Sequence, residues 1–195
     1  MEFSPLKTND DFIIEGSFII IPRIVSDERG FFFESWNKLK FDKIIGEKIS
    51  FCQDNHSRSA MGVLRGMHYQ LDPHSQGKLV RCTQGTIYDV AVDIRRSSKT
   101  FGKWGGVTLS QENKKQLWIP KGFAHGFLTL SEASEVQYKT DGFWDKDSER
   151  SLKWNDKNLN INWPKISKFK EPTLSKKDLK APSFFDAKTK GEIFK

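Results

Sequence analysis

Short strand-like segments separated by turns run through most of the sequence, and this pattern limits the folds open to the chain. The segments are 4 to 9 residues long, rich in β-branched and aromatic residues, and bounded by Gly, Asn and Asp. In the clearest of them Val90, Val92 and Ile94 alternate with other residues. Such a series predicts an antiparallel β-sandwich or barrel. The expected strands are residues 18–25, 31–36, 49–54, 62–70, 78–83, 86–94, 105–109, 116–119, 126–130 and 135–140.

Helices are expected to be few and short. Asn37 is a plausible N-cap for a helix that continues to Ile45 and ends at Gly46. Residues 26–30 read as a turn between two strands, and residues 1–16 as a lead-in. There is no strand–helix alternation of the Rossmann kind and no glycine-rich phosphate loop. From Trp154 onward prolines break the pattern, and residues 175–178 could form one capped helical turn.

The length of 195 residues favours one domain, or a core with a small appendage. We expect a single mainly-β domain over residues 1–195. Its core would extend to about residue 155, and residues 156–195 would form a C-terminal extension that packs back on it.

Residues 62–70, Gly-Val-Leu-Arg-Gly-Met-His-Tyr-Gln, form a strand-like stretch with polar groups set into it. Strict alternation would place Arg65 and His68 on opposite faces. A bulge at Gly66 would shift the alternation and bring both side chains to one face. A cation beside a histidine is suited to binding an anion and moving a proton. The residues alone also allow an exposed arginine and a buried, hydrogen-bonded histidine.

Polar clusters interrupt the apolar strands at three places. A buried polar group without a partner destabilises a protein by about 1–3 kcal/mol. Several together therefore predict a polar pocket inside the β-domain, where barrels and jelly rolls hold ligands. The clusters are residues 53–56, Arg65 with His68, Lys78 and Arg81, and residues 120–127, with Asp89 and Asp93 on the strand between them.

Proton transfer is the chemistry that these clusters favour. Metal sites in jelly-roll enzymes commonly use two histidines one residue apart, and here Gln70 stands at that spacing after His68. His68 could act as a base with Tyr138 as the opposing acid. Lys78 or Arg65 could stabilise an enolate or bind phosphate. Taken alone, Tyr138 could also be a tyrosine of the core or of an interface.

The net charge of +7 is concentrated in the tail, where residues 157–195 hold ten lysines and four acidic residues. A basic tail could contact nucleic acid or a membrane, but a solvated lysine-rich surface is the simpler interpretation, and we expect neither partner.

Cys52 and Cys82 form no disulfide framework and have no metal spacing. Reduced thiols and the lack of a signal-peptide pattern predict a cytoplasmic protein. No apolar run is long enough to span a bilayer.

Several motifs in their order and spacing resemble the dTDP-4-dehydrorhamnose 3,5-epimerase family. The resemblance runs from about Phe18 to about Pro182 and rests on many motifs together. They are residues 53–57 (Gln-Asp-Asn-His-Ser), 62–70, 76–81 (Gln-Gly-Lys-Leu-Val-Arg), 89–95 (Asp-Val-Ala-Val-Asp-Ile-Arg), 118–127, 138–139 (Tyr-Lys) and 154–156 (Trp-Asn-Asp).

The resemblance implies a cupin-type jelly roll that works as a homodimer without metal or organic cofactor, with N-terminal strands swapped between protomers. The implied substrate is a dTDP-linked 4-keto-6-deoxyhexose, used in dTDP-L-rhamnose synthesis for cell-surface polysaccharide. Its C4 ketone acidifies the protons at C3 and C5. A base removes each proton, an enolate forms, and an acid reprotonates the opposite face.

The same resemblance implies roles for individual residues. His68 would be the base, Asp178 the carboxylate paired with it, Tyr138 the acid and Lys78 an enolate-stabilising cation. Trp144 would stack on the thymine ring. The other implied substrate contacts are Arg29, Glu34, Gln53, Asp54, Asn55, Arg65, His125, Glu149 and Lys177. Met67 replaces a usual Leu at similar volume, and Phe143 stands where a Tyr is common, so any hydroxyl role there is lost.

Three other functions remain open at the level of sequence. One is an epimerase that acts at C3 or C5 alone, or on another dTDP-keto sugar. The second is a non-catalytic jelly roll that binds sugar nucleotides, and the third is a metal-dependent cupin oxygenase. Exchange of the C3 and C5 protons with solvent would separate the first two from a double epimerase.

Overall fold

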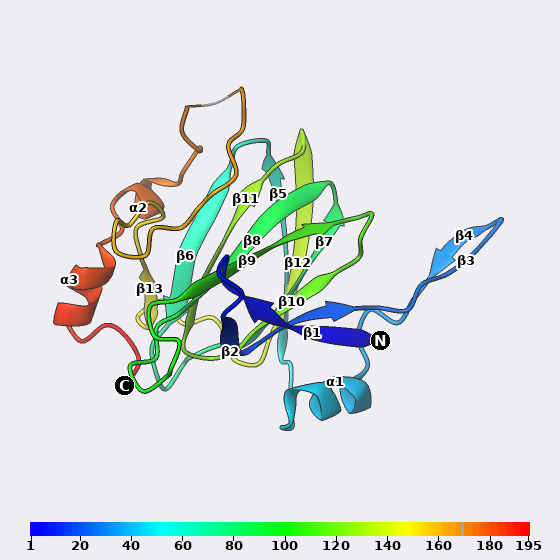
Figure 1. The fold of residues 1–195 in the computed structure, drawn as a ribbon, viewed down its shortest axis with the longest axis horizontal. Coiled ribbons are helices and arrows are strands. Elements are labelled where there is room, and N and C mark those ends of the chain that lie inside the picture. The colour runs from blue at the N-terminus through cyan, green and yellow to red at the C-terminus, as the bar shows by residue number, and fades with distance from the viewer. Residues whose placement is uncertain (169) are drawn as a thin grey trace.

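The strands form two antiparallel sheets that face each other, as the ribbon in Figure 1 shows. The structure is a computed structural model that describes residues 1–168 and 170–195. The six-stranded sheet has the order β1-β2-β10-β7-β12-β5. Its strands are Glu2–Lys7 (β1), Ile13–Ile21 (β2), Gln116–Ile119 (β10), Lys78–Gln84 (β7), Ala133–Thr140 (β12) and Gln53–Ala60 (β5).

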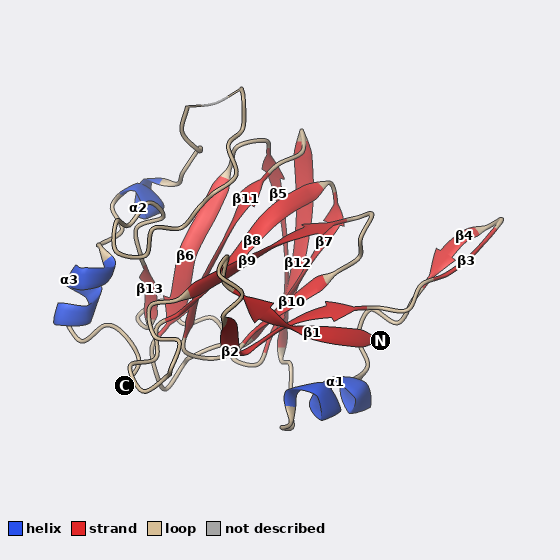
Figure 2. Cartoon of the chain, in the orientation of Figure 1, coloured by secondary structure: helices blue, strands red, loops and turns tan. Residues whose placement is uncertain are grey.

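The second sheet has five strands in the order β13-β6-β11-β8-β9. All of its pairings are antiparallel, as are those of the first sheet. Strands take up most of the ordered secondary structure, as the colouring of Figure 2 makes plain. The predicted mainly-β sandwich is confirmed. The five strands are Glu149–Ser151 (β13), Leu64–Gln70 (β6), Phe123–Thr129 (β11), Thr86–Asp93 (β8) and Trp104–Ser110 (β9).

The main core lies between the sheets. Leu109, Leu117 and Val136 belong to this buried cluster and come from strands of both sheets. Burial of a side chain of this size stabilises the fold by about 1.5–3 kcal/mol. Because one face of each sheet meets the other sheet, polar side chains on those faces are buried unless a cavity opens beside them.

One predicted helix forms as expected from its local signals. The helix α1 (Lys38–Ile45) begins after Asn37, whose side chain accepts from the backbone N–H of Lys40 at 3.1 Å, and ends at Gly46 with φ +83°. Phe41 is its buried residue and packs against Trp118 of β10, with ring centroids 5.2 Å apart. The helix therefore covers the outer face of the six-stranded sheet.

The N-terminal third departs from the sequence-based expectation. Residues 1–16 were expected to be a lead-in, yet they contain β1 and the start of β2. The expected strand 18–25 stops at Ile21, where β2 ends. The hairpin that follows consists of two three-residue strands, Val25–Asp27 (β3) and Gly30–Phe32 (β4). This hairpin is exposed along its length and projects from the sandwich in Figure 1.

The C-terminal residues cover the outer face of the five-stranded sheet. They contain two short helices, Lys176–Leu179 (α2) and Phe184–Thr189 (α3), as the sequence predicted for the tail. Phe184 is buried in one cluster with Met67 of β6, and the hydroxyl of Tyr69 donates to the carbonyl of Glu192 at 2.7 Å. The backbone of Thr173 pairs with that of residues 62–64. The tail is thereby attached to β6, the strand that carries His68.

Candidate active site

A bulge in β6 brings Arg65 and His68 to the face that looks toward the six-stranded sheet. His68 lies opposite His125 of β11, and the register shifts before Arg65, so that two residues of β6 stand opposite one of β11. Gly66 occupies the bulge at φ +141°, and a Cβ there would lie 2.5 Å from the Cα of Gly126. Only glycine permits this conformation and this approach. Of the two arrangements that the sequence left open, the structure therefore has the bulge, with Arg65 and His68 on one face.

His68 is paired with a buried carboxylate from the tail. Its Nε2 lies 2.6 Å from Oδ1 of Asp178, which is 3% exposed. Ser175 caps α2 by accepting from the N–H of Asp178 and so fixes the backbone that presents the carboxylate. An ionised carboxylate only accepts hydrogen bonds, so Nε2 carries the proton and Nδ1 keeps the lone pair of a base.

The pKa of Asp178 lies below its ordinary value. Burial acts to raise it, but the hydrogen bond and charge of His68 and the hydrogen bond of Ser175 outweigh burial. The carboxylate is therefore ionised at neutral pH and stabilises a protonated His68 ring.

A cavity of about 270 Å³ opens between the two sheets beside His68. Its walls come from both sheets, since His68 lies on β6, Lys78 on β7 and Tyr138 on β12. Loop residues between β12 and β13 close one side. Of the residues predicted for the site, the following line it: Gln53, Asn55, His68, Lys78, Tyr138, Trp144 and Glu149.

Lys78 presents a partly desolvated cation to this cavity. Burial lowers the pKa of its ammonium to about 8, although the charges of Asp89 and Glu149 act to raise it. The group is thus mostly protonated at pH 7. Removed from water, it interacts more strongly with a developing negative charge than an exposed lysine would.

Tyr138 stands on the sheet opposite His68. Burial raises the pKa of its hydroxyl, the nearby Arg65 acts to lower it, and Glu149 acts to raise it further. The hydroxyl therefore stays protonated at neutral pH and can donate a proton. A base on one wall and an acid on the other is the arrangement that inversion at a carbon between them requires.

A second histidine–carboxylate pair lies beside the first. Nε2 of His125 is 2.6 Å from Oδ1 of Asp89, and both side chains are buried. Burial lowers the pKa of His125, although Asp89 acts to raise it. His125 was predicted to contact substrate; it is paired with His68 on the adjacent strand and is not among the cavity-lining residues.

Gln53 bonds to two other residues of the lining, and two more predicted residues, Lys177 and Arg65, bond to residues at or near the cavity. The side chain of Gln53 donates to Asn55 at 2.9 Å and accepts from the backbone N–H of Trp144 at 3.1 Å. Nζ of Lys177 pairs with Glu149 at 2.5 Å and so ties α2 to β13. Arg65 donates to Ser59 Oγ at 3.0 Å and is not among the lining residues, although its charge acts on Tyr138.

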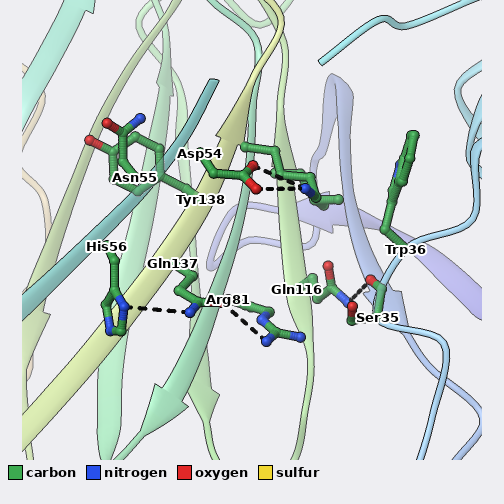
Figure 3. A pocket seen from close by; sticks show the side chains of 11 residues that line it. Ser35, Trp36, Asp54, Asn55, His56, Arg81, Gln116, Gln137 and Tyr138 are labelled. Atoms are coloured by element: carbon green, nitrogen blue, oxygen red, sulfur yellow. Dashed lines mark hydrogen bonds and ion pairs between the residues drawn. The ribbon is translucent and has the colours of Figure 1, made fainter. Parts of the chain in front are cut away.

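Asp54 lies outside this cavity, on the opposite face of β5. It pairs with Lys139 at 2.9 Å and lines a separate hollow on the outer face of the six-stranded sheet, shown in Figure 3. Several polar groups of that hollow are bonded to one another, as Arg81 and Gln137 are at 3.1 Å. It has no base paired with a buried carboxylate, so the cavity beside His68 is the better candidate for catalysis.

Arg29 and Glu34 also lie away from the cavity of their own chain. Arg29 is at the turn of the projecting hairpin and pairs with Asp27 at 2.5 Å. Glu34 follows the hairpin and bonds to Asn37 at 3.0 Å and to Lys40. A single chain therefore does not bring these two predicted nucleotide contacts to His68.

The described residues hold neither a metal-type side-chain cluster nor a membrane-spanning helix. No group of three or more His, Cys, Asp or Glu side chains there has a geometry suited to a metal ion. None of the helices in residues 1–168 and 170–195 is long and hydrophobic enough to cross a membrane.

Comparison with known proteins identifies the family. The profile of dTDP-4-dehydrorhamnose 3,5-epimerase matches residues 11–186. The Shigella flexneri protein of that name is 57% identical over 169 residues, which cover 87% of this chain and 91% of the relative. The chain belongs to the dTDP-4-dehydrorhamnose 3,5-epimerase family.

Solved structures of dTDP-4-dehydrorhamnose 3,5-epimerases share the whole fold. The enzyme from Elizabethkingia anophelis has 46% identity and a TM-score of 0.86 over 95% of this chain and 98% of its own. The dTDP-6-deoxy-D-glucose-3,5-epimerase from Legionella pneumophila, in complex with dTDP-4-keto-L-rhamnose, has 43% identity and a TM-score of 0.88. That match covers all of this chain and 98% of the other. The predicted fold, with the cupin-like sandwich of this epimerase family, is confirmed.

Two glutamines that line the cavity of this family member had no role expected from their sequence motifs. Gln70 and Gln76 bond to the backbone of the loop that carries Trp144. The sequence position of Gln70 could have indicated that it belongs to the site, because it follows His68 by two residues and so shares its face of β6. Asp89 had been noted only as a polar residue on its strand, and its pairing with His125 needed the register of β8 against β11.

Proposed function

We propose that the chain is a dTDP-4-dehydrorhamnose 3,5-epimerase, an isomerase that converts dTDP-4-dehydro-6-deoxy-D-glucose to dTDP-4-dehydro-L-rhamnose. The observation that carries the proposal is the His68–Asp178 pair, 2.6 Å apart, beside a cavity that also contains Tyr138 and Lys78. Family membership supports the substrate, and the side chains supply the means of proton transfer.

His68 acts as the base in this proposal. Nδ1 removes the proton at C3 or C5, which the C4 ketone acidifies, and the ring becomes an imidazolium. Asp178 stabilises that cation and holds the ring in one orientation. Positioned bases of this kind contribute about 10²–10⁴-fold to a rate.

Lys78 stabilises the enolate. When the C–H bond breaks, its electron pair moves to form the enolate and negative charge gathers on the C4 oxygen. An ammonium with a pKa of about 8 is charged at neutral pH and already partly stripped of water, so it can stabilise that oxygen at little cost of reorganisation.

Tyr138 returns a proton from the other wall of the cavity. Because it belongs to β12 and His68 to β6, the two groups approach the sugar from different sheets. Protonation of the enolate carbon by Tyr138 inverts the configuration at that carbon. Proton exchange with water then restores Tyr138 and His68 before the second carbon reacts.

Residues around the cavity supply the proposed contacts to the nucleotide and to the sugar. Trp144 offers a partly exposed ring for the thymine base. Further contacts would come from the lining residues Gln53, Asn55 and Glu149 and from Lys177, which pairs with Glu149. Arg65 and His125 would support the polar sugar groups from beside the lining.

We propose further that the enzyme is a homodimer in which the β3–β4 hairpin of each protomer reaches the cavity of its partner. Arg29 and Glu34 would then contact the nucleotide in the partner's site. The exposed rings of Phe31 and Phe32 support this, since large apolar side chains on a projecting hairpin favour burial against another surface.

Domain organisation and compartment belong to the same proposal. Residues 1–195 would fold as one domain whose C-terminal extension completes the site through Asp178. The described cysteines, Cys52 and Cys82, are free, as thiols are in a reducing compartment, and we place the enzyme in the cytoplasm.

The test is proton NMR of dTDP-4-keto-6-deoxyglucose with the purified chain in D₂O, with and without EDTA. Deuterium at both C3 and C5, unaffected by EDTA, is expected. Exchange at one carbon would instead indicate a single-centre epimerase. Binding without exchange would indicate a sugar-nucleotide binding protein, and loss of exchange in EDTA would contradict metal-free proton transfer.

A further inference from the structure

Gln70 holds the backbone on both sides of Trp144. Its amide nitrogen donates to the carbonyl oxygen of Phe143 at 3.1 Å, and its amide oxygen accepts from the N–H of Asp145 at 2.9 Å. The nitrogen also donates to the carbonyl of His74 at 2.5 Å. The side chain is 4% exposed, and both of its N–H groups are used.

Two other glutamines hold the same loop. Gln76 donates to the carbonyl of Gly142 at 2.7 Å, and Gln53 accepts from the N–H of Trp144 at 3.1 Å. Backbone groups of four consecutive residues, 142–145, are thus each bonded to a glutamine side chain from another segment. All three glutamines line the cavity beside His68.

The loop is fixed while its two aromatic side chains face solvent. Phe143 is 70% exposed and Trp144 is 57% exposed. Large exposed rings beside a cavity are typical of a ligand contact. A backbone that is held in place before binding lowers the conformational entropy lost when a ligand orders the rings.

We propose that Gln70 is a positioning residue that preorganises Trp144 for stacking against the base of the nucleotide sugar. This inference rests on the proposed function, because it takes the ligand to be a dTDP-sugar. Gln70 makes no hydrogen bond to His68, Asp178, Tyr138 or Lys78. Its loss therefore weakens nucleotide binding and leaves the proton-transfer groups in place.

The variants to compare are Gln70→Met and Gln111→Met. Gln111 directly follows β9 and also bonds to backbone, since its side-chain oxygen accepts from the N–H of Gly85 at 3.0 Å, but it lies outside the cavity beside His68. Calorimetric Kd for dTDP, together with kcat and KM, is measured for each folded variant. For Gln70→Met we expect Kd and KM to rise about tenfold, as ordering of one or two side chains at binding implies, with kcat unchanged within about twofold. Gln111→Met should leave all three values unchanged.

Gln70→Glu tests the same contacts with almost the same shape. It keeps an acceptor for the N–H of Asp145 but turns an oxygen toward the carbonyls of Phe143 and His74, so it should weaken dTDP binding in the same direction. This variant keeps the inference testable if Gln70→Met does not fold.

A double-mutant cycle with Trp144→Ala shows whether Gln70 acts through the ring. If it does, Gln70→Met adds less than about twofold to Kd once Trp144 is absent. Full additivity, an unchanged Kd in both Gln70 variants, or a fall in kcat at constant KM would overturn the inference. If the wild-type chain binds no dTDP, both the proposed function and this inference are overturned. If both Gln70 variants show normal proton exchange and normal dTDP binding, this inference alone is overturned.

Discussion

His68 and Asp178 are 110 positions apart in the sequence and 2.6 Å apart in the folded chain. The contact exists because Thr173 pairs with residues 62–64 of the core, and Ser175 then starts the short helix that carries Asp178. The histidine comes from the sandwich and the carboxylate from the tail. The proposed catalytic role of this pair would therefore depend on docking of the C-terminal extension.

Asp178→Asn should lower kcat by about 10²–10⁴-fold, because an amide neither stabilises the imidazolium nor fixes the tautomer with a proton on Nε2. Asp186→Asn, on the exposed first turn of α3, is the control and should keep kcat. Steady-state kinetics of both variants is the measurement. Equal kcat values for wild type and Asp178→Asn would contradict the proposed role.

The same pair predicts a pH dependence of stability. Since folding lowers the pKa of Asp178 below its ordinary value of 3.8, its ionised form stabilises the fold at any pH above 3.8. That stabilisation is lost as the pH falls through the lowered folded-state pKa. The free energy of unfolding of wild type and of Asp178→Asn can be measured with urea from pH 7 downward. The difference between the two values should narrow below pH 3.8. A difference that grows toward low pH would contradict the lowered pKa.

Lys78 should set the alkaline limit of kcat/KM. Its pKa of about 8 means that the ammonium is lost as the pH rises through 8, and a neutral amine cannot stabilise an enolate. Tyr138, with a pKa raised above 10, does not titrate in this range. Lys78→Arg should lower the rate but move the alkaline limb upward, since arginine stays charged. A pH–rate profile whose alkaline limb is the same in both proteins would assign it to another group.

Gly66→Ala should destabilise the fold by about 2–4 kcal/mol, through positive-φ strain and overlap with the backbone of Gly126. Gly46→Ala is the comparison, because Gly46 also has positive φ but nothing within 4 Å of its Cβ position. That change should cost only about 1–2 kcal/mol. Thermal or urea unfolding measures both, and equal effects would show that the β6 bulge can relax.

Arg29→Ala should raise KM about tenfold and leave kcat nearly unchanged, if the hairpin of one protomer binds the nucleotide in its partner's site. Arg23→Ala, an exposed arginine just before the hairpin, should have no effect. Sedimentation equilibrium should give a dimer. A monomer with full activity would rule out a role for the hairpin in a partner's site.

Local signals were sufficient for some elements and insufficient for others. Helix α1 was predicted to the residue because Asn37 and Gly46 cap it with bonds inside the segment. The strand β1 was missed because its outer residues are exposed and its apolar residues show no clean alternation. Only pairing with β2 makes Glu2–Lys7 a strand.

For the candidate site, sequence patterns named residues and the fold decided which of them meet. Strict alternation along residues 62–70 places Arg65 and His68 on opposite faces, and only a bulge at Gly66, which the sequence allowed but did not require, brings them to one face. The motif resemblance named Asp178 in a tail broken by prolines. The resemblance grouped Asp54 with Gln53 and Asn55, although alternation along a strand places Asp54 on the opposite face from both neighbours. The structure agrees with the alternation, since Asp54 lines the outer hollow and not the cavity beside His68.

The sequence by itself determined the class of fold, a glycine at position 66 that permits a bulge, the capped helices and the types of side chain available for proton transfer. These depend on backbone conformation and on neighbours within a few positions. Only the tertiary structure decided the pairing of His68 with Asp178, of His125 with Asp89, and the glutamine contacts to residues 142–145. Those contacts join segments far apart in the chain, and they form only when the packing of two sheets and a tail brings the segments within hydrogen-bonding distance.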